Sequence, residues 1–94
     1  MVEKIIKMNR GISGRNASDI VFGMNTLNSF IYFEKNGRCV NAKSILGLLS
    51  LDVQAGDDIK IIANGADEAE ETSDISKVLK LFEWEDLHTW IQRM

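Results

Sequence analysis

The chain has 94 residues, 45% of them hydrophobic, which is enough for one packed domain and too little for two separate cores. The net charge of −3 and the dispersed Lys and Arg residues argue against direct binding of nucleic acid, and no apolar stretch approaches the roughly 20 residues of a membrane span. A single cysteine, Cys39, excludes an internal disulfide and suits a reducing compartment, so we expect a cytoplasmic protein with one domain, residues 1–94.

The first half of the chain predicts a strand, a helix and a β-hairpin. Residues 2–8 form a short run with β-branched side chains, which indicates a first strand. From Asn16 to Leu27, apolar residues recur at the i, i+3, i+4 and i+7 spacing of an amphipathic helix. Residues 29–35 and 38–42 then flank Asn36-Gly37, which is the strongest short-range signal for a hairpin.

The second half predicts a short helix, a strand and a last helix. The hydroxyl of Ser44 is placed to cap a short helix over residues 44–50. Residues 58–63 contain three isoleucines and read as a strand. The acidic residues at 67–71 suit the solvated N-terminal end of a helix. The order β-α-β-β-α-β-α predicts an α+β fold, in which the helices cover one face of an antiparallel sheet.

A long motif in the middle of the chain resembles a known family. Residues 34–51 read Glu-Lys-Asn-Gly-Arg-Cys-Val-Asn-Ala-Lys-Ser-Ile-Leu-Gly-Leu-Leu-Ser-Leu. This is similar to the acidic-x-Asn-Gly and Val-Asn-x-Lys-Ser-Ile-x-Gly-x-x-Ser-Leu pattern of HPr, the small phosphocarrier of the bacterial phosphotransferase system. The similarity extends from about Lys4 to Glu71. It implies an HPr-like open-faced β-sandwich, with three helices on one face of a four-stranded antiparallel sheet.

The loop at residues 11–18 departs from that family at its central position. HPr proteins have Gly-[Ile/Leu]-His-Ala-Arg-Pro-Ala here, and the histidine receives phosphate and passes it on. In this chain Ser13 occupies the histidine position, Gly14 the alanine position and Asn16 the proline position. A phosphoserine ester would hold phosphate instead of relaying it, so we expect no histidine-based transfer and no catalytic residue.

Two interpretations of this loop remain open. In the first, the loop is an anion- or phosphate-binding site, because glycines let the backbone expose amides and the arginine adds a fork of donors. Its residues would be Gly11, Ser13, Gly14, Arg15 and Asn16. In the second, Ser13 or Asn16 simply caps the following helix.

Ser44 is the candidate for regulation. In Gram-positive members of the family, the serine of the Lys-Ser-Ile motif is phosphorylated by an ATP-dependent HPr kinase/phosphorylase, and Lys43-Ser44-Ile45 matches that motif. A phosphate at the N-terminus of a helix meets free amides and the favourable end of the helix dipole. The alternative is that Ser44 is a plain N-cap without a regulatory role.

The short helix after Ser44 carries more apolar side chains than one buried face can use. Leu48 and Leu51 suit the core, so a second stripe should be partly exposed. That stripe consists of Ile45, Leu46 and Leu49. In the family, kinases, transporter components and a LacI-type repressor bind there, so we expect a partner-binding patch, unless a C-terminal helix covers it.

Residues 83–94 form a predicted C-terminal amphipathic extension, in which residues 86–94 depart from the family. Its apolar residues have helical spacing and should pack on the domain or on a second subunit, which makes a homodimer a further candidate. They are Leu87, Trp90, Ile91 and Met94.

The sequence therefore predicts an HPr-like regulatory protein that lacks the phosphocarrier histidine. Like the catabolite-repression member of the family, it would be phosphorylated on Ser44 by an HPr kinase/phosphorylase and act as an adaptor or corepressor with a LacI-type transcriptional repressor. The alternative is a diverged interaction module with no part in phosphotransfer. No residues have metal-ligand spacing or the arrangement of a catalytic pair, so we expect no metal, no cofactor and no enzymatic activity.

Overall fold

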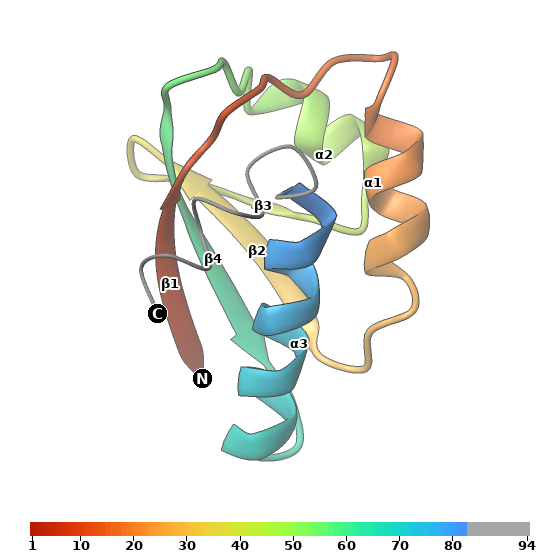
Figure 1. Ribbon diagram of the computed structural model, residues 1–94, viewed down its shortest axis with the longest axis vertical. Helices are drawn as coiled ribbons and strands as arrows, with labels where there is room; N and C mark the ends of the chain where they lie inside the picture. The colour runs from red at the N-terminus through yellow and green to blue at the C-terminus, as the bar shows by residue number, and fades with distance from the viewer. Residues whose placement is uncertain (83–94) are drawn as a thin grey trace.

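The computed structural model describes residues 1–82 and arranges them in the predicted order β-α-β-β-α-β-α (Figure 1). The predicted C-terminal extension, residues 83–94, lies outside the described residues. The seven elements are β1 (Val2–Lys7), α1 (Ala17–Met24), β2 (Phe30–Lys35), β3 (Arg38–Asn41), α2 (Ile45–Ser50), β4 (Asp58–Asn64) and α3 (Glu68–Phe82).

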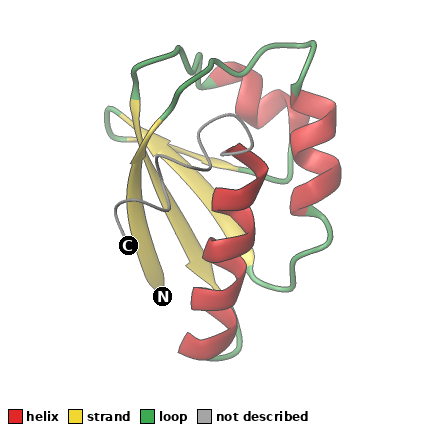
Figure 2. Cartoon of the chain, viewed as in Figure 1, coloured by secondary structure: helices red, strands yellow, loops and turns green. Residues whose placement is uncertain are grey.

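The four strands form one antiparallel sheet in the order β1-β4-β2-β3. β4 therefore lies between the first two strands of the chain, and β2 and β3 form the hairpin that Asn36-Gly37 predicts. Both turn residues have positive φ, 53° and 82°, as this type of tight turn requires. Figure 2 shows the helices together on one side of the sheet, which confirms the expected open-faced β-sandwich.

The core lies between the sheet and its helices. On β2, Ile31 and Phe33 face the helices and are almost fully buried, at 1% and 0% exposure. The opposite face carries Tyr32 and Glu34, as the alternation of a strand predicts. Each helix adds its own apolar face to the same cluster. Its helical members are Ala17, Ile20, Met24, Leu48, Ile75, Val78 and Leu79.

Helix α1 is shorter than the predicted span of 16–27. It begins at Ala17 and ends at Met24, and the side chains that follow close its last turn. The side-chain amide of Asn25 donates to the Val21 carbonyl at 3.0 Å, and the Thr26 hydroxyl donates to the Gly23 carbonyl at 2.7 Å. Polar side chains of this kind compete with helical backbone bonds, so the helix stops although Leu27 remains buried.

The sequence predicts that the acidic start of α3 is solvated, and the structure differs from this prediction. Glu71 is 3% exposed and accepts a hydrogen bond from the backbone amide of Gly65 at 2.8 Å. One turn later, Asp74 is 2% exposed and accepts a hydrogen bond from the amide of Ser29 at 2.9 Å. These two carboxylates tie α3 to the loops at the ends of β4 and α1, because a buried carboxylate must find donors.

Candidate functional site

The N-terminus of α2 is built around Ser44. The residue has an extended backbone, and its hydroxyl oxygen accepts a hydrogen bond from the amide of Gly47 at 3.1 Å. Its carbonyl accepts the first helical bond, from Leu48 at 3.0 Å. The prediction that Ser44 is the N-cap is therefore confirmed. Ser44 as a whole is half-buried.

The connection from β3 into α2 holds Ser44 in this position. The side-chain oxygen of Asn41 accepts a hydrogen bond from the Lys43 amide at 2.9 Å, and the Asn41 carbonyl accepts one from the Ser44 amide at 3.1 Å. The Lys43 ammonium donates to the carbonyl of Leu27 at 2.8 Å, which joins α2 to the loop after α1. Lys43 thus has a structural role that the sequence did not suggest.

Gly47 allows the first turn of α2 to lie close to β3. A β-carbon at this position would lie 3.0 Å from the Asn41 carbonyl oxygen and 3.5 Å from the Ser44 hydroxyl oxygen. The first distance is tighter than an ordinary van der Waals contact, whereas the second is an ordinary one. The glycine of the Lys-Ser-Ile-x-Gly pattern therefore has a physical reason, since it lets the first turn of α2 lie against the Asn41 carbonyl.

The loop before α1 is closed by Asn16. The Asn16 side chain accepts a hydrogen bond from the Ser13 amide at 2.9 Å and donates one to the Gly11 carbonyl at 3.0 Å. It makes no capping hydrogen bond to α1, although Asn16 occupies the N-cap position. The Ser13 hydroxyl accepts a hydrogen bond from the backbone amide of Arg15 at 3.3 Å, and Arg15 precedes the first residue of α1. Neither side chain acts as the simple helix cap that the sequence allowed.

These bonds occupy most of the amides that an anion would need. Besides Ser13 and Arg15, the amides of Asn16 and Ala17 both donate to the Ser13 carbonyl, at 3.1 and 2.9 Å. An anion bound here would have to displace the loop's own acceptors or rely on the exposed Arg15 side chain. An anion site at Gly11, Ser13, Gly14, Arg15 and Asn16 therefore stays a prediction.

Gly11 and Gly14 differ in what they contribute to this loop. A β-carbon on Gly11 would lie 2.7 Å from the carbonyl oxygen of Val53, so only glycine lets the loop lie against that segment. No atom lies within 4 Å of the corresponding position on Gly14. Gly11 is therefore needed for packing, whereas Gly14 is open to substitution.

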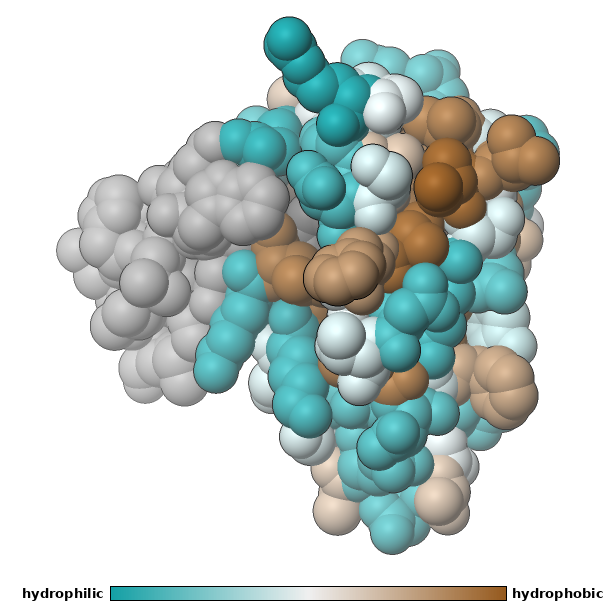
Figure 3. All heavy atoms as spheres, turned by 90° about the vertical axis from the view of Figure 1, so that its right-hand side faces the viewer, coloured by the Kyte–Doolittle hydropathy of each residue, from teal (hydrophilic) through white to brown (hydrophobic). Residues whose placement is uncertain are grey.

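The predicted apolar stripe of α2 is exposed at Ile45 and Leu46, and Leu49 is only partly exposed. Leu48 and Leu51 are buried, whereas Ile45 is 42% exposed and Leu46 is 79% exposed. Leu49 is partly buried and packs against the core. Figure 3 shows apolar side chains gathered on the face of the molecule that α1 and α2 form.

The sequence reading missed one residue of this surface. Phe22 of α1 is 80% exposed, the highest value among the large hydrophobic side chains of the described residues. Phe22 does not share the helical spacing of the buried residues Ala17, Ile20 and Met24. That spacing could have identified Phe22 as an exposed residue. We call the surface formed by Phe22, Ile45, Leu46 and Leu49 the α1/α2 patch.

Two carboxylates outside this surface have pKa values below their ordinary range. For Asp57, the Lys35 ammonium at 2.8 Å lowers the pKa most, followed by a hydrogen bond from the Gln54 amide. For Glu71, the Gly65 amide lowers the pKa most, followed by the amino group of Met1 at 3.0 Å. Both groups hold loops and strand ends in place and are structural.

Residues 1–82 contain neither a cluster of possible metal ligands nor a helix that could cross a membrane. In this range no three His, Cys, Asp or Glu side chains come together as metal ligands would. Its helices are also too short or too polar to span a bilayer. The one histidine of the sequence, His88, lies outside the described range.

Comparison with known proteins points to one family. The family model described as "PTS HPr component phosphorylation site" matches residues 2–80. The HPr-like protein Crh of Halalkalibacterium halodurans is 44% identical over 72 residues, which cover 74% of this chain and 86% of Crh.

Solved structures agree with the sequence comparison. The crystal structure of HPr-C-His from Thermoanaerobacter tengcongensis has a TM-score of 0.77 at 35% identity and covers 88% of this chain and 92% of its own. The crystal structure of Crh from Bacillus subtilis, described as a dimer with a swapping domain, has a TM-score of 0.60 at 37% identity and covers 80% and 87%.

Proposed function

Because the chain belongs to the HPr family of the phosphotransferase system, we propose that it is a regulatory member of that family controlled by phosphorylation of Ser44. One observation carries this proposal. Ser44, a half-buried residue in a matching Lys43-Ser44-Ile45 motif, caps α2 and directly precedes the exposed residues Ile45 and Leu46.

The residue at the phosphocarrier position argues against a relay of phosphate. Ser13 replaces the histidine, and the loop around it is closed by hydrogen bonds to Asn16. A serine ester is far more stable than a phosphohistidine, so phosphate placed there would not pass readily to a sugar transporter component. The protein is then a regulatory member of the family and not an enzyme or a carrier.

Phosphorylation would change the α1/α2 patch through charge. The kinase would transfer the terminal phosphoryl group of ATP to the Ser44 oxygen, which loses its proton, and ADP would leave. A phosphate oxygen can then accept the Gly47 amide bond that the hydroxyl accepts now. The change adds about two negative charges next to an apolar surface, which favours partners that present arginines beside apolar side chains.

We place the protein in the cytoplasm as an adaptor or corepressor in carbon catabolite control. Its partners would be an HPr kinase/phosphorylase and a LacI-type transcriptional repressor. A homodimer is also proposed, since Crh of Bacillus subtilis is described as a dimer with a swapping domain. The sheet has two edge strands, β1 and β3, and β1 is the candidate for such an exchange, because as the first element it is joined to the other elements by a single loop.

The second candidate is an interaction module that does not take part in phosphotransfer. The exposure of Phe22, Leu46 and Ile45 favours it, because a binding surface needs no phosphate to be useful. The two candidates share the α1/α2 patch and differ in whether Ser44 is modified.

The deciding experiment is incubation with an HPr kinase and ATP, followed by mass spectrometry. We expect one added phosphate on Ser44 and none on a Ser44→Ala variant. Ser50→Ala is the matched control, because Ser50 lies in the same short helix and its exposed hydroxyl donates to the Gly47 carbonyl at 2.7 Å. No added phosphate, or phosphate on Ser50 or Ser13, would favour the interaction module.

A further inference from the structure

The α1/α2 patch exposes more apolar surface than a free monomer needs. Phe22 is 80% exposed and Leu46 is 79% exposed, and Ile45 adds 42% beside them. These side chains come from two helices that pack against each other, and exposed apolar surface of this kind usually marks a site that something covers. Figure 3 shows it on the face formed by α1 and α2, with polar side chains around it.

The last described helix ends beside this face. The side chain of Leu81 packs on α1, since a β-carbon on Gly23 would lie 2.8 Å from its Cδ2 atom. Gly23 directly follows Phe22 in the chain. Figure 1 shows the C-terminal end of α3 on the same side of the sheet as α1 and α2. The chain therefore leaves the described structure next to the patch.

The segment that follows has the length and composition to cover the patch. As a helix, the twelve residues 83–94 would extend about 18 Å, and a helix with its side chains is about 10–12 Å wide. The segment is thus long enough to cross the width of α1, which packs against α2. Its apolar side chains follow the spacing of one helical stripe, which matches an apolar surface on the domain. They are Leu87, Trp90, Ile91 and Met94.

We propose that residues 83–94 bind the α1/α2 patch of their own chain, over Phe22 and Leu46. The patch is then open to a partner only when this segment is displaced. A tether this short gives an effective concentration in the millimolar range, so a weak contact is sufficient within one chain. A second copy would need a much stronger contact to compete at ordinary concentrations. A role of this contact in regulation rests on the proposed function of the patch. The binding of the segment to the patch is independent of that function.

The sequence provides a built-in reporter for this contact. Both tryptophans of the chain, Trp84 and Trp90, lie in the segment, so tryptophan fluorescence of the full chain reports on the segment alone. We expect the native protein to emit at a shorter wavelength than the denatured chain and to resist quenching by acrylamide. In a Phe22→Ser and Leu46→Ser double variant, emission should shift to that of the denatured chain and quenching should increase. Both side chains are exposed, so the fold should survive, which far-UV circular dichroism can verify.

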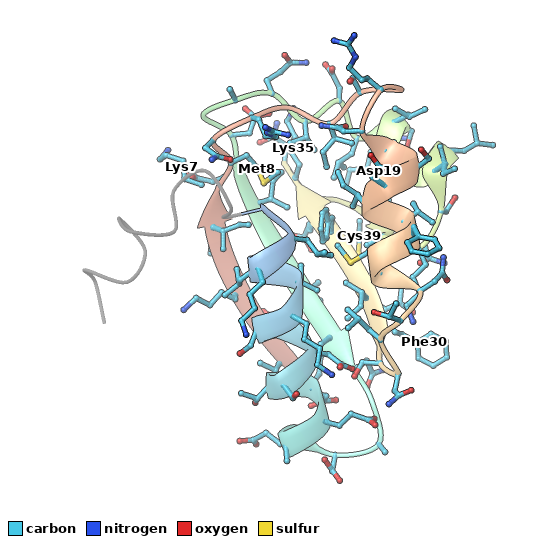
Figure 4. All side chains as sticks on the ribbon, turned by 45° about the vertical axis from the view of Figure 1, so that its right-hand side comes forward. Lys7, Met8, Asp19, Phe30, Lys35 and Cys39 are labelled. Carbon is cyan, nitrogen blue, oxygen red and sulfur yellow. The ribbon has the colours of Figure 1, made fainter. Side chains whose placement is uncertain are left out.

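The matched control is Phe30→Ser. Phe30 is also a well-exposed aromatic residue, at 66%, but it pairs with Asn64 of β4, shortly before α3 begins at Glu68. It therefore lies near the start of α3, at the opposite end from Leu81. Figure 4 shows it below α1, away from Asp19 on the upper half of that helix. We expect its replacement to leave the emission unchanged.

Three results would overturn the proposal. Native emission equal to that of the denatured chain would mean that the segment is not bound. An unchanged spectrum in the double variant, or an equal change with Phe30→Ser, would mean that it binds elsewhere. A blue shift that disappears on dilution, together with a doubled mass at high concentration, would make a second copy the occupant. None of these measurements involves a kinase, so they are independent of whether Ser44 is phosphorylated.

Discussion

Replacing Ser44 by alanine tests the cap of α2, on which the phosphorylation proposal depends. The variant loses the hydrogen bond from the Gly47 amide to the Ser44 hydroxyl, 3.1 Å long in the native protein. Loss of a serine N-cap costs about 0.5–2 kcal/mol. Because Ser44 is half-buried, water can partly replace the hydroxyl. We therefore expect a loss near the middle of that range, about 1 kcal/mol. For a domain of this size, that lowers the melting temperature by about 4–8 °C.

The assay is thermal unfolding of the full chain, followed by far-UV circular dichroism. Ser44→Asp should be close to the native protein in stability, because a carboxylate at the N-cap accepts the same amide and favours the helix dipole. Ser50→Ala is the control within the same helix, and its exposed position predicts a change within about 0.5 kcal/mol. A domain is typically stable by about 5–15 kcal/mol, so Ser44→Ala remains folded and is a valid control for the kinase reaction.

The reasoning would be refuted by a Ser44→Ala variant as stable as the native protein. The cap would then not contribute to stability, and the claim that a phosphate takes over its hydrogen bond would lose its basis. Equal losses for Ser44→Ala and Ser50→Ala would have the same consequence, because they would point to a general sensitivity of α2.

Three further predictions concern the loop, the core and the effect of pH. With phosphoenolpyruvate and the general phosphotransferase enzyme, the native protein should take up no acid-labile phosphate, and Ser13→His should restore some uptake; label on the native chain would contradict this. Leu48→Ala, at 0% exposure, should cost about 2–5 kcal/mol in denaturant unfolding, whereas Ser50→Ala, at an exposed position of the same helix, should cost less than about 0.5 kcal/mol. Asp57 and Glu71 have pKa values lower than in an unfolded chain, so they stabilise the fold above the ordinary carboxyl range, and this contribution is lost as the pH falls through their folded pKa values. Melting temperatures should thus fall on acidification, and less steeply for Asp57→Asn; an unchanged slope would exclude that group as a cause.

Local signals in the sequence were sufficient for most elements of the fold. The Asn36-Gly37 hairpin, the cap at Ser44 and the alternation in β2 all depend on contacts between residues close together in the chain. The resemblance to HPr added the arrangement of these elements, and the sheet order and the solved structures of the family confirm it. The buried and exposed sides of α2 also followed from sequence, because helical spacing separates Leu48 from Leu46.

Details of the two sites depended on contacts that sequence patterns do not encode. Asn16 lies at the N-cap of α1, yet its side chain turns back to the Gly11 carbonyl, since the loop offers it better partners than the helix does. Lys43 looked like part of a kinase motif, and the structure shows its ammonium bound to the carbonyl of Leu27. Each of these bonds joins groups whose distance is set by how the elements pack.

By itself, then, the sequence determined the type and order of the elements, the replacement of histidine by Ser13 and the position of Ser44 at a helix start. Only the tertiary structure decided that Phe22 joins Leu46 on one exposed surface and that Glu71 is buried against Gly65. The physical reason is the range of the interactions. Hydrogen bonds within a turn and the periodicity of a helix are fixed by neighbouring residues, whereas the exposure of a side chain depends on which distant elements pack beside it.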